Sequence, residues 1–114
     1  MDIRTINKEY LDEIEKKLPT PLDEERKKKL IVKVLNNDNN AKKELLENNL
    51  RLVLKVVKEY QDKSFYAEDL VSIGTLGLIK AINSYRKGVK IQFIEYATDL
   101  IKEEIQKFIS KITC

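Results

Sequence analysis

Two glycines, Gly74 and Gly77, stand three residues apart inside an apolar segment. Apolar residues and glycines recur there at steps of three and four residues, which predicts one helix over about residues 67–84. Each glycine destabilises a helix interior by roughly 1 kcal/mol relative to alanine. The pair therefore predicts that a second helix packs closely here, because a glycine leaves room for a neighbouring backbone. The predicted packing face consists of Leu70, Gly74, Gly77, Leu78, Ala81 and Tyr85.

The opposite side of the same predicted helix carries a mixture of polar and apolar side chains. We expect this side to be free for a second partner, so that one face closes the fold and the other binds. The alternative is that its apolar members belong to the ordinary core. This side consists of Asp69, Ser72, Ile73, Leu76 and Ile79.

The rest of the chain predicts an all-α fold. Its 114 residues are enough for one domain with a real core. With 3 glycines, 2 prolines and few alternating β-branched residues, we expect a compact helical bundle of about four to five helices. An N-terminal amphipathic helix and linker are expected over residues 1–18, and a helical domain over residues 19–114. The predicted helices cover about residues 6–17, 21–35, 41–60 and 67–84, with the last starting near residue 93.

Local signals mark where these helices begin and end. Thr20 can cap a helix, Pro21 suits its first position, and Asp23 can return a hydrogen bond to the cap. The asparagine-rich segment 36–40 predicts a turn, because Asn and Asp side chains bond their own backbone and tolerate left-handed conformations. Residues 61–66 are expected to form a loop and residues 86–90 a basic connector. The stripe of Ile6, Tyr10, Ile14 and Leu18 is expected to cover the bundle.

The composition excludes several classes of function. The chain has no histidine and a single cysteine, Cys114. It therefore lacks the residues for a serine or cysteine nucleophile paired with histidine, for a zinc site of paired thiols and for an internal disulfide. We expect no enzyme activity, no cofactor and no metal. With no signal peptide and no apolar stretch of about 18 residues, the expected location is the cytoplasm, with no membrane contact.

The charge balance is slightly basic. The formal net charge is +3, from 22 Lys and Arg against 19 Asp and Glu. The surplus lies in the second half of the chain, since the first 50 residues hold 11 groups of each sign. A surplus this small is only a weak indication of a polyanionic partner such as nucleic acid.

Several short motifs follow one another at fixed spacing in the second half of the chain: Asn49-Leu50-Arg51-Leu52-Val53, Glu68-Asp69-Leu70, residues 73–81, Tyr85, Phe93 and Tyr96-Ala97-Thr98. In this order they resemble the conserved second region of bacterial RNA polymerase sigma factors, preceded by part of region 1.2 in about residues 20–45. Residues 72–75 and 101–105 are most similar to the sporulation-type sigma factors of Gram-positive spore formers. The resemblance covers about residues 18–109.

The resemblance implies that the glycine-bearing helix binds a protein. In the family, this helix docks against the paired clamp helices in the largest subunit of core RNA polymerase. The matching positions in this chain are Asp69, Ser72, Ile73, Thr75 and Ile79. Core polymerase is thus the implied partner, and an anti-sigma factor is a further candidate partner.

The connector and the start of the last helix resemble the family's promoter-melting segment, which acts on the non-template strand of the promoter −10 element. Melting requires aromatic rings, on which unpaired bases stack, and basic groups, which neutralise phosphates. Tyr85 and Phe93 also lie where a bundle needs apolar anchors, and Tyr85 is expected in the core. The matching candidates for DNA binding are Arg86, Lys87, Lys90, Phe93, Tyr96, Lys102, Glu103 and Gln106.

The chain departs from housekeeping members of the family at two pairs of positions. Asp99 and Leu100 stand where those members have two tryptophans. Glu103 and Gln106 stand where they have a glutamine and a threonine that face promoter bases. Sporulation-type members also lack the tryptophan pair. Because a carboxylate accepts a hydrogen bond from cytosine but repels phosphate, we do not expect the housekeeping promoter sequence to be recognised.

A complete factor of this type continues through a linker, in regions 3 and 4, to a helix-turn-helix that reads the upstream promoter element. This chain ends at Cys114. From the sequence we expect an expressed fragment, the product of a split gene or a free-standing domain, and the three explanations stay open.

Three hypotheses for function follow. The leading one is a sigma factor domain that binds the polymerase clamp and helps to recognise and melt the promoter −10 element. The alternative is a sigma-like polymerase-binding module without promoter recognition of its own, acting as a decoy or as one half of a split factor. The third is a helical bundle of unrelated role, which would not bind polymerase.

Overall fold

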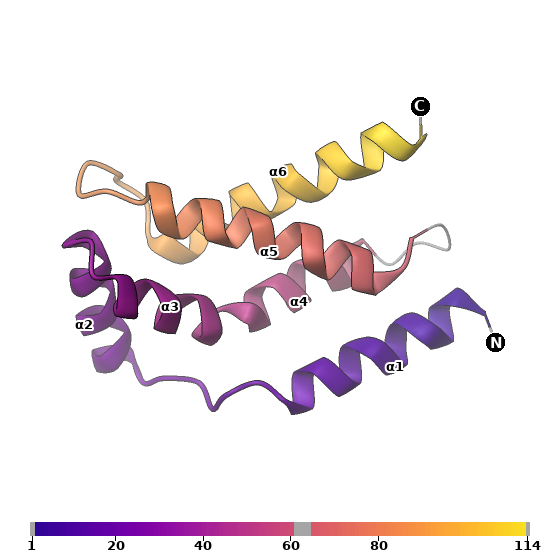
Figure 1. Ribbon diagram of the computed structural model, residues 1–114, viewed down its shortest axis with the longest axis horizontal. Coiled ribbons are helices and arrows are strands. Elements are labelled where there is room, and N and C mark those ends of the chain that lie inside the picture. The colour runs from indigo at the N-terminus through magenta and orange to yellow at the C-terminus, as the bar shows by residue number, and fades with distance from the viewer. Residues whose placement is uncertain (1, 61–64, 114) are drawn as a thin grey trace.

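The computed structural model describes residues 2–60 and 65–113, and all regular structure in these two ranges is helical. This confirms the all-α prediction, with six helices in the described residues instead of four to five. Residues 61–64 of the predicted loop lie outside the described residues. The helices are α1 (Ile3–Lys16), α2 (Glu24–Leu35), α3 (Asn39–Asn48), α4 (Leu50–Glu59), α5 (Ala67–Ser84) and α6 (Phe93–Thr113) (Figure 1).

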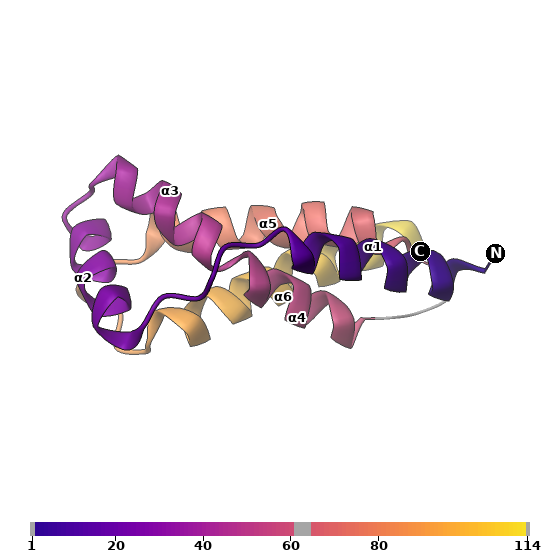
Figure 2. The same ribbon diagram turned by 90° about the horizontal axis from the view of Figure 1, so that it is seen from below.

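The arrangement of the helices is a layered bundle built around α5 and α6, which pack against each other (Figure 1). Helix α4 packs on both of them, and α1 lies against α4 and α5. Helix α3 joins α2 to this group by packing against α2, α4 and α5. Figure 2 shows α2 at the end of the molecule opposite to the two chain termini. The molecule measures 46 × 32 × 20 Å along its principal axes.

The core receives apolar side chains from all six helices. Its centre lies where α4, α5 and α6 meet, and each buried aliphatic side chain there contributes about 1.5–3 kcal/mol relative to an exposed one. This packing gives α5 a fixed support on one side. The large side chains that are almost completely buried there are Val53, Val56, Val57, Leu70, Leu78, Ile101 and Ile105.

The predicted continuous helix over residues 41–60 is wrong, because Asn49 divides it into α3 and α4. The Nδ2 atom of Asn49 donates a hydrogen bond of 2.9 Å to the carbonyl oxygen of Leu45. Asn48 makes the same contact with the carbonyl of Glu44. Asparagine side chains that bond the backbone in this way compete with helix continuation. The chain therefore leaves the helical conformation at Asn49, with φ −117° and ψ 10°, and α4 begins at Leu50.

The start of α2 also differs from the prediction. Asp23, and not Thr20, caps this helix, because its Oδ1 accepts a hydrogen bond of 2.8 Å from the backbone N–H of Arg26. Residues 18–23 precede the helix without regular structure. Aspartate at the N-cap satisfies one of the N–H groups that a helix start leaves without a partner. Pro21 therefore lies in the linker between α1 and α2.

The asparagine-rich turn between α2 and α3 is confirmed. Asn37 has a φ of 62°, the left-handed conformation that asparagine tolerates. Asp38 then caps α3 by accepting from the N–H of Ala41 at 3.0 Å. Helix α3 therefore starts at Asn39, two residues earlier than expected.

Helix α1 starts at Ile3, because Asp2 caps it by accepting from the N–H of Thr5. Its buried residues are Asn7 and Leu11, whereas Ile6, expected in the apolar stripe, keeps 37% of its surface exposed. The other three residues of the predicted stripe, Tyr10, Ile14 and Leu18, do pack partly against the core, so the prediction fails at Ile6 and misses Asn7 and Leu11. No helix within residues 2–60 and 65–113 combines the length and the apolar character needed to cross a membrane.

Candidate functional site

Helix α5 presents two different faces, as its sequence predicts. Leu70, Gly74, Leu78 and Ala81 are buried on the side that packs against the bundle. On the opposite side Leu76 is 50% exposed and Ile79 is 36% exposed. Asp69 and Ser72 are also exposed, and Ile73 and Thr75 are half-buried. Leu76 and Ile79 therefore lie outside the core, while Ile73 packs partly against it.

The glycine pair explains how the packed face of α5 is held. An ideal Cβ atom at Gly77 would lie 2.6 Å from the Cα of Ile101, which is closer than real Cβ contacts. At Gly74 the nearest neighbour of such an atom is the side chain of Val53, at 3.0 Å. The predicted close approach of a second helix is therefore confirmed, and that helix is α6. The close contact between α5 and α6 therefore supports α5 from the side opposite to its exposed face.

A groove between α3 and α5 continues the exposed face, and no sequence pattern predicts it. Its volume is about 230 Å³. Ile79 lies in its wall, so the groove adjoins the predicted docking positions. Packing of α3 on α5 creates it, and no single segment carries a signal for such a contact. The lining residues are Lys42, Lys43, Leu46, Ile79, Ile82 and Asn83.

The connector between α5 and α6 is organised by three aromatic rings. The Tyr85 ring packs edge-on against Phe93, with centroids 5.3 Å apart, and lies 5.3 Å from the Tyr96 ring. The Tyr85 hydroxyl donates a hydrogen bond of 2.9 Å to the carbonyl oxygen of Ile91. The Tyr96 hydroxyl pairs with the Ser84 hydroxyl at 2.6 Å. These contacts hold the two ends of the connector together.

The three rings differ in exposure. Tyr85 lies in the core as expected, and Phe93 is only 6% exposed. Tyr96 is half-buried. Of the predicted DNA-binding aromatics, Phe93 thus supports Tyr85 from inside the fold, and Tyr96 reaches the surface.

The predicted DNA-binding cations fall into two groups. Arg86, Lys87 and Lys90 are exposed in the connector, and Arg86 donates to the carbonyl oxygen of Tyr85 at 3.0 Å. Within the described residues, Lys87 and Lys90 form no ion pair. Lys102 pairs with Glu59 at 3.5 Å. The connector cations precede Tyr96 by six to ten residues in the sequence, whereas Lys102 is paired with a carboxylate of this chain.

The middle of α6 carries a network of ion pairs. Lys107 lies 3.2 Å from Glu103 and 3.4 Å from Glu104. Glu104 also pairs with Lys80 of α5, and the hydrogen bond from Lys80 lowers the pKa of the Glu104 carboxyl. The carboxylates of Glu103 and Glu104 raise the pKa of Lys107. Two more predicted DNA-binding positions, Glu103 and Gln106, belong to this segment, and Gln106 donates to the Tyr60 hydroxyl at 3.0 Å.

Comparison with known proteins gives a consistent result. The family model described as "Sigma-70 region 2" matches residues 45–113. The RNA polymerase sigma-E factor of Clostridium acetobutylicum is similar, with 35% identity over 82% of this chain and 40% of that protein. The RNA polymerase sigma-28 factor of Bacillus thuringiensis subsp. kurstaki is 44% identical over 76% of this chain and 37% of its own length.

The RNA polymerase sigma-K factor of Bacillus subtilis is 42% identical over 76% of this chain and 30% of its own length. The chain thus spans between 30% and 40% of the length of these three relatives. The matched segment includes α4, α5, the connector and α6. Both surfaces described above, the exposed face of α5 and the connector, lie inside it.

Proposed function

Because the chain belongs to the sigma-70 region 2 family, we propose that it acts in transcription initiation as a sigma factor domain. Its exposed α5 face binds the clamp helices of core RNA polymerase. Its connector and the first turns of α6 help to recognise and melt the non-template strand of the promoter −10 element. The observation that carries the proposal is the exposed side of α5, which stands inside the family match.

The docking part rests on the composition of that side. Leu76 and Ile79 are three residues apart on the helix, so their exposed side chains are neighbours. Asp69 and Ser72 border them with polar groups. Protein interfaces combine an apolar centre with a polar rim in this way. A partner helix can lie along such a face without any change in the fold of α5, because the opposite face holds α5 in place.

The DNA part rests on the connector. Tyr96 offers a ring on which an unpaired base can stack, and such stacking contributes about 1–3 kcal/mol per base. Lys87 and Lys90 offer charges that are not neutralised within the described residues. Phosphate contacts by such charges release counterions and add affinity that does not depend on sequence. Lys90 lies in the connector and Tyr96 in the first turn of α6, and in this proposal one DNA strand contacts both.

A second candidate function is a polymerase-binding module without promoter recognition of its own. The ion pairs of α6 favour it, because Lys102 and Lys107 face carboxylates of this chain. DNA phosphates could bind these lysines only if the ion pairs were broken, which disfavours DNA binding along that part of α6. In this case the docking face alone would be functional.

Docking is tested by measuring the affinity of the chain for core RNA polymerase from Bacillus subtilis. We expect Leu76→Ala and Asp69→Arg to weaken binding at least tenfold each, which corresponds to about 1.4 kcal/mol. Glu9→Arg is the matched control, because it reverses an exposed charge on α1. Unchanged affinity of both α5 variants, with intact helical circular dichroism, would show that another surface docks.

The DNA function is tested with the complex of chain and polymerase and a single-stranded non-template promoter DNA. We expect the complex to retain the DNA, and Tyr96→Ala and Lys90→Ala to weaken retention. Tyr66→Ala is the aromatic control, because Tyr66 is exposed at the opposite end of α5. Polymerase binding without DNA retention by the unsubstituted chain would favour the second candidate function.

A further inference from the structure

One polar side chain among the described residues is buried in the fold, that of Asn7 in α1, and it is 2% exposed. Its Nδ2 donates a hydrogen bond of 2.9 Å to the carbonyl oxygen of Phe65. Its Oδ1 accepts a hydrogen bond of 2.8 Å from the backbone N–H of Ala67. The amide N–H donor and the amide oxygen acceptor of Asn7 each have a partner, so the burial of this side chain leaves neither polar atom without a hydrogen bond.

The Oδ1 atom of Asn7 binds a backbone N–H at the start of α5. Ala67 is the first residue of α5, and its N-cap residue, Tyr66, makes no side-chain capping bond. The first N–H groups of a helix have no partner inside the helix, and short polar side chains at the N-cap usually supply one. Here the partner comes from a different helix, 60 residues earlier in the chain.

Asparagine is suited to this position because its side chain can donate one hydrogen bond and accept another. An aspartate could accept from Ala67 but, when ionised, could not donate to Phe65, and a leucine of similar size could do neither. The same side chain therefore fixes the residue before Tyr66 and the residue after it. The direction in which the chain enters α5 depends on α1.

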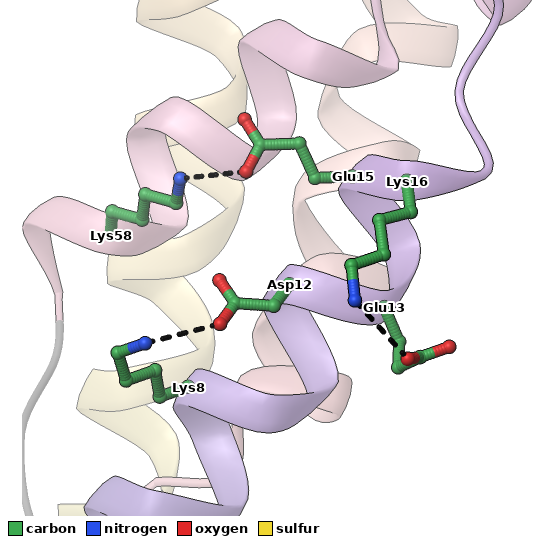
Figure 3. Close-up of polar contacts among 6 residues, drawn as sticks. All are labelled: Lys8, Asp12, Glu13, Glu15, Lys16 and Lys58. Atoms are coloured by element: carbon green, nitrogen blue, oxygen red, sulfur yellow. Dashed lines mark hydrogen bonds and ion pairs between the residues drawn. The ribbon is translucent and has the colours of Figure 1, made fainter.

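The remaining contacts of α1 agree with this role. Figure 3 shows ion pairs within α1, Lys8–Asp12 and Glu13–Lys16, and one between α1 and α4, Glu15–Lys58. The last pair is separated by 3.4 Å. All three are exposed pairs, which contribute little to stability. Buried contacts must therefore position α1, and Asn7 and Leu11 are the residues of α1 that are buried.

Tyr10, one turn after Asn7 on α1, is half-buried and packs against the core. Burial raises the pKa of the Tyr10 hydroxyl, and the carboxylate of Glu68 raises it further. Glu68 is the second residue of α5. Helix α1 thus packs against α5 and bonds the first residue of α5 through Asn7, and the Tyr10 hydroxyl on the same face senses the charge of Glu68.

We propose that Asn7 is a positioning residue for the docking face of α5. It caps α5 from α1 and so holds the first turn, which includes Asp69, in the geometry that binds polymerase. This inference rests on the proposed docking function. Pre-ordering of a binding surface raises affinity because less ordering is required when the partner arrives. Helix α1 is then part of the docking unit, and not merely a cover of the bundle.

The test compares Asn7→Leu with the rescue variant Asn7→Leu/Tyr66→Ser. Tyr66 already has the extended backbone of an N-cap, with φ −77° and ψ 131°. A serine there can accept from the N–H of Glu68 or Asp69 and so hold the first turn of α5 locally, through a different N–H from the one that Asn7 binds. Two quantities are measured on the full chain: amide hydrogen exchange in the first turn of α5, and affinity for core RNA polymerase from Bacillus subtilis. Lys8→Ala is the control, because Lys8 is the exposed neighbour of Asn7.

We expect Asn7→Leu to speed exchange at Ala67, whose N–H Asn7 binds, and at Glu68–Leu70 at least tenfold, and to weaken polymerase binding about three- to tenfold. Exchange in the middle of α6 should change less. The Tyr66→Ser substitution should recover most of both losses, which a general loss of stability would not allow. Lys8→Ala should leave both quantities unchanged. If Asn7→Leu does not fold, Asn7→Asp is used, and its exchange is expected to lie between those of the parent and an uncapped helix.

Two results would overturn the inference. Unchanged exchange in the first turn of α5 would show that Asn7 does not cap it. Faster exchange with unchanged polymerase affinity would show that the cap does not position the docking face. If the unsubstituted chain does not bind polymerase at all, the docking proposal fails, and the exchange measurement still decides whether Asn7 caps α5.

Discussion

An added Cβ atom at Gly77 would lie 2.6 Å from the Cα of Ile101, so the backbones of α5 and α6 meet there without room for a side chain. The carbonyl oxygen of Leu100 is equally close to the same position. Gly74 differs, because its nearest neighbours are side-chain methyl groups of Val53, Ile101 and Ile105. Side chains can shift locally, whereas a helix backbone moves only with the whole helix.

The first prediction concerns Gly77→Ala. Alanine favours an isolated helix by about 1 kcal/mol over glycine, but here its methyl group would push α6 away from α5. We expect a net loss of about 1–3 kcal/mol in the free energy of unfolding, the usual range for overpacking. Urea denaturation followed by circular dichroism measures it.

The other two glycines are matched controls. Gly74→Ala should stay within about 1 kcal/mol of the parent, because only side chains must adjust. Gly88→Ala should be neutral, since nothing lies within 4 Å of an added Cβ. A Gly77→Ala variant as stable as Gly88→Ala would contradict the backbone contact. Gly74→Leu, with a much larger side chain, should unfold or strongly destabilise the protein.

The second prediction separates the two candidate caps of α2. Asp23 accepts from the N–H of Arg26, so Asp23→Ala should lower the free energy of unfolding by about 0.5–2 kcal/mol. Thr20→Ala should change it by less than about 0.5 kcal/mol, because Thr20 lies in the exposed linker. Thermal unfolding of the two variants side by side measures this difference. A larger loss of stability for Thr20→Ala than for Asp23→Ala would show that Thr20, and not Asp23, caps α2.

Much of the fold could be predicted from local signals. The bounds of α5 agree with the prediction, because its periodicity, its acidic first turn and the change to a basic connector all act within the segment. The break at Asn49 escaped prediction since apolar residues continue with helical spacing on both sides of it. The cap of α2 was misplaced because Pro21 after Thr20 resembles a helix start, whereas Asp23, a stronger N-cap residue than threonine, makes the local bond to the N–H of Arg26.

In the candidate site, too, features of one helix could be predicted, whereas features that depend on contacts between distant segments could not. The exposed face of α5 follows from the periodicity of one helix, so its residues could be named in advance. Asn7 could not, because an asparagine followed by Lys8 and Glu9 suggests a solvent-facing position, and its partners, Phe65 and Ala67, lie about 60 residues away. The groove beside Ile79 likewise exists only once α3 packs against α5.

The third prediction concerns the connector. The Tyr85 hydroxyl donates to the carbonyl oxygen of Ile91 from a mostly buried ring, so Tyr85→Phe removes one hydrogen bond and leaves the ring contacts in place. We expect a loss of about 0.5–1.5 kcal/mol in the free energy of unfolding. Amide exchange in the connector should become faster. Tyr66→Phe is the control, since Tyr66 is exposed, and an equal effect there would contradict the assignment.

The last prediction concerns the pH dependence of the ion pair between Lys80 and Glu104. The pKa of Glu104 is lowered from its ordinary value of 4.5, first by the hydrogen bond from Lys80. A carboxyl whose pKa is lower in the folded protein stabilises the fold fully at pH values above the unfolded pKa. This stabilisation is lost as the pH falls below 4.5 and then through the lower pKa that Glu104 has in the folded protein.

Lys80→Met should therefore be less stable than the parent at pH 7, by up to about 1 kcal/mol, the upper value for exposed pairs. The difference should shrink as the pH is lowered from 5 to 3, because protonated Glu104 no longer distinguishes lysine from methionine. Lys107 also contacts Glu104, so some pH dependence will persist in the variant. Urea midpoints across this pH range measure it, with Lys87→Met as the unpaired control. A difference that stays constant down to pH 3 would show that the Lys80 ammonium group does not stabilise the fold through Glu104.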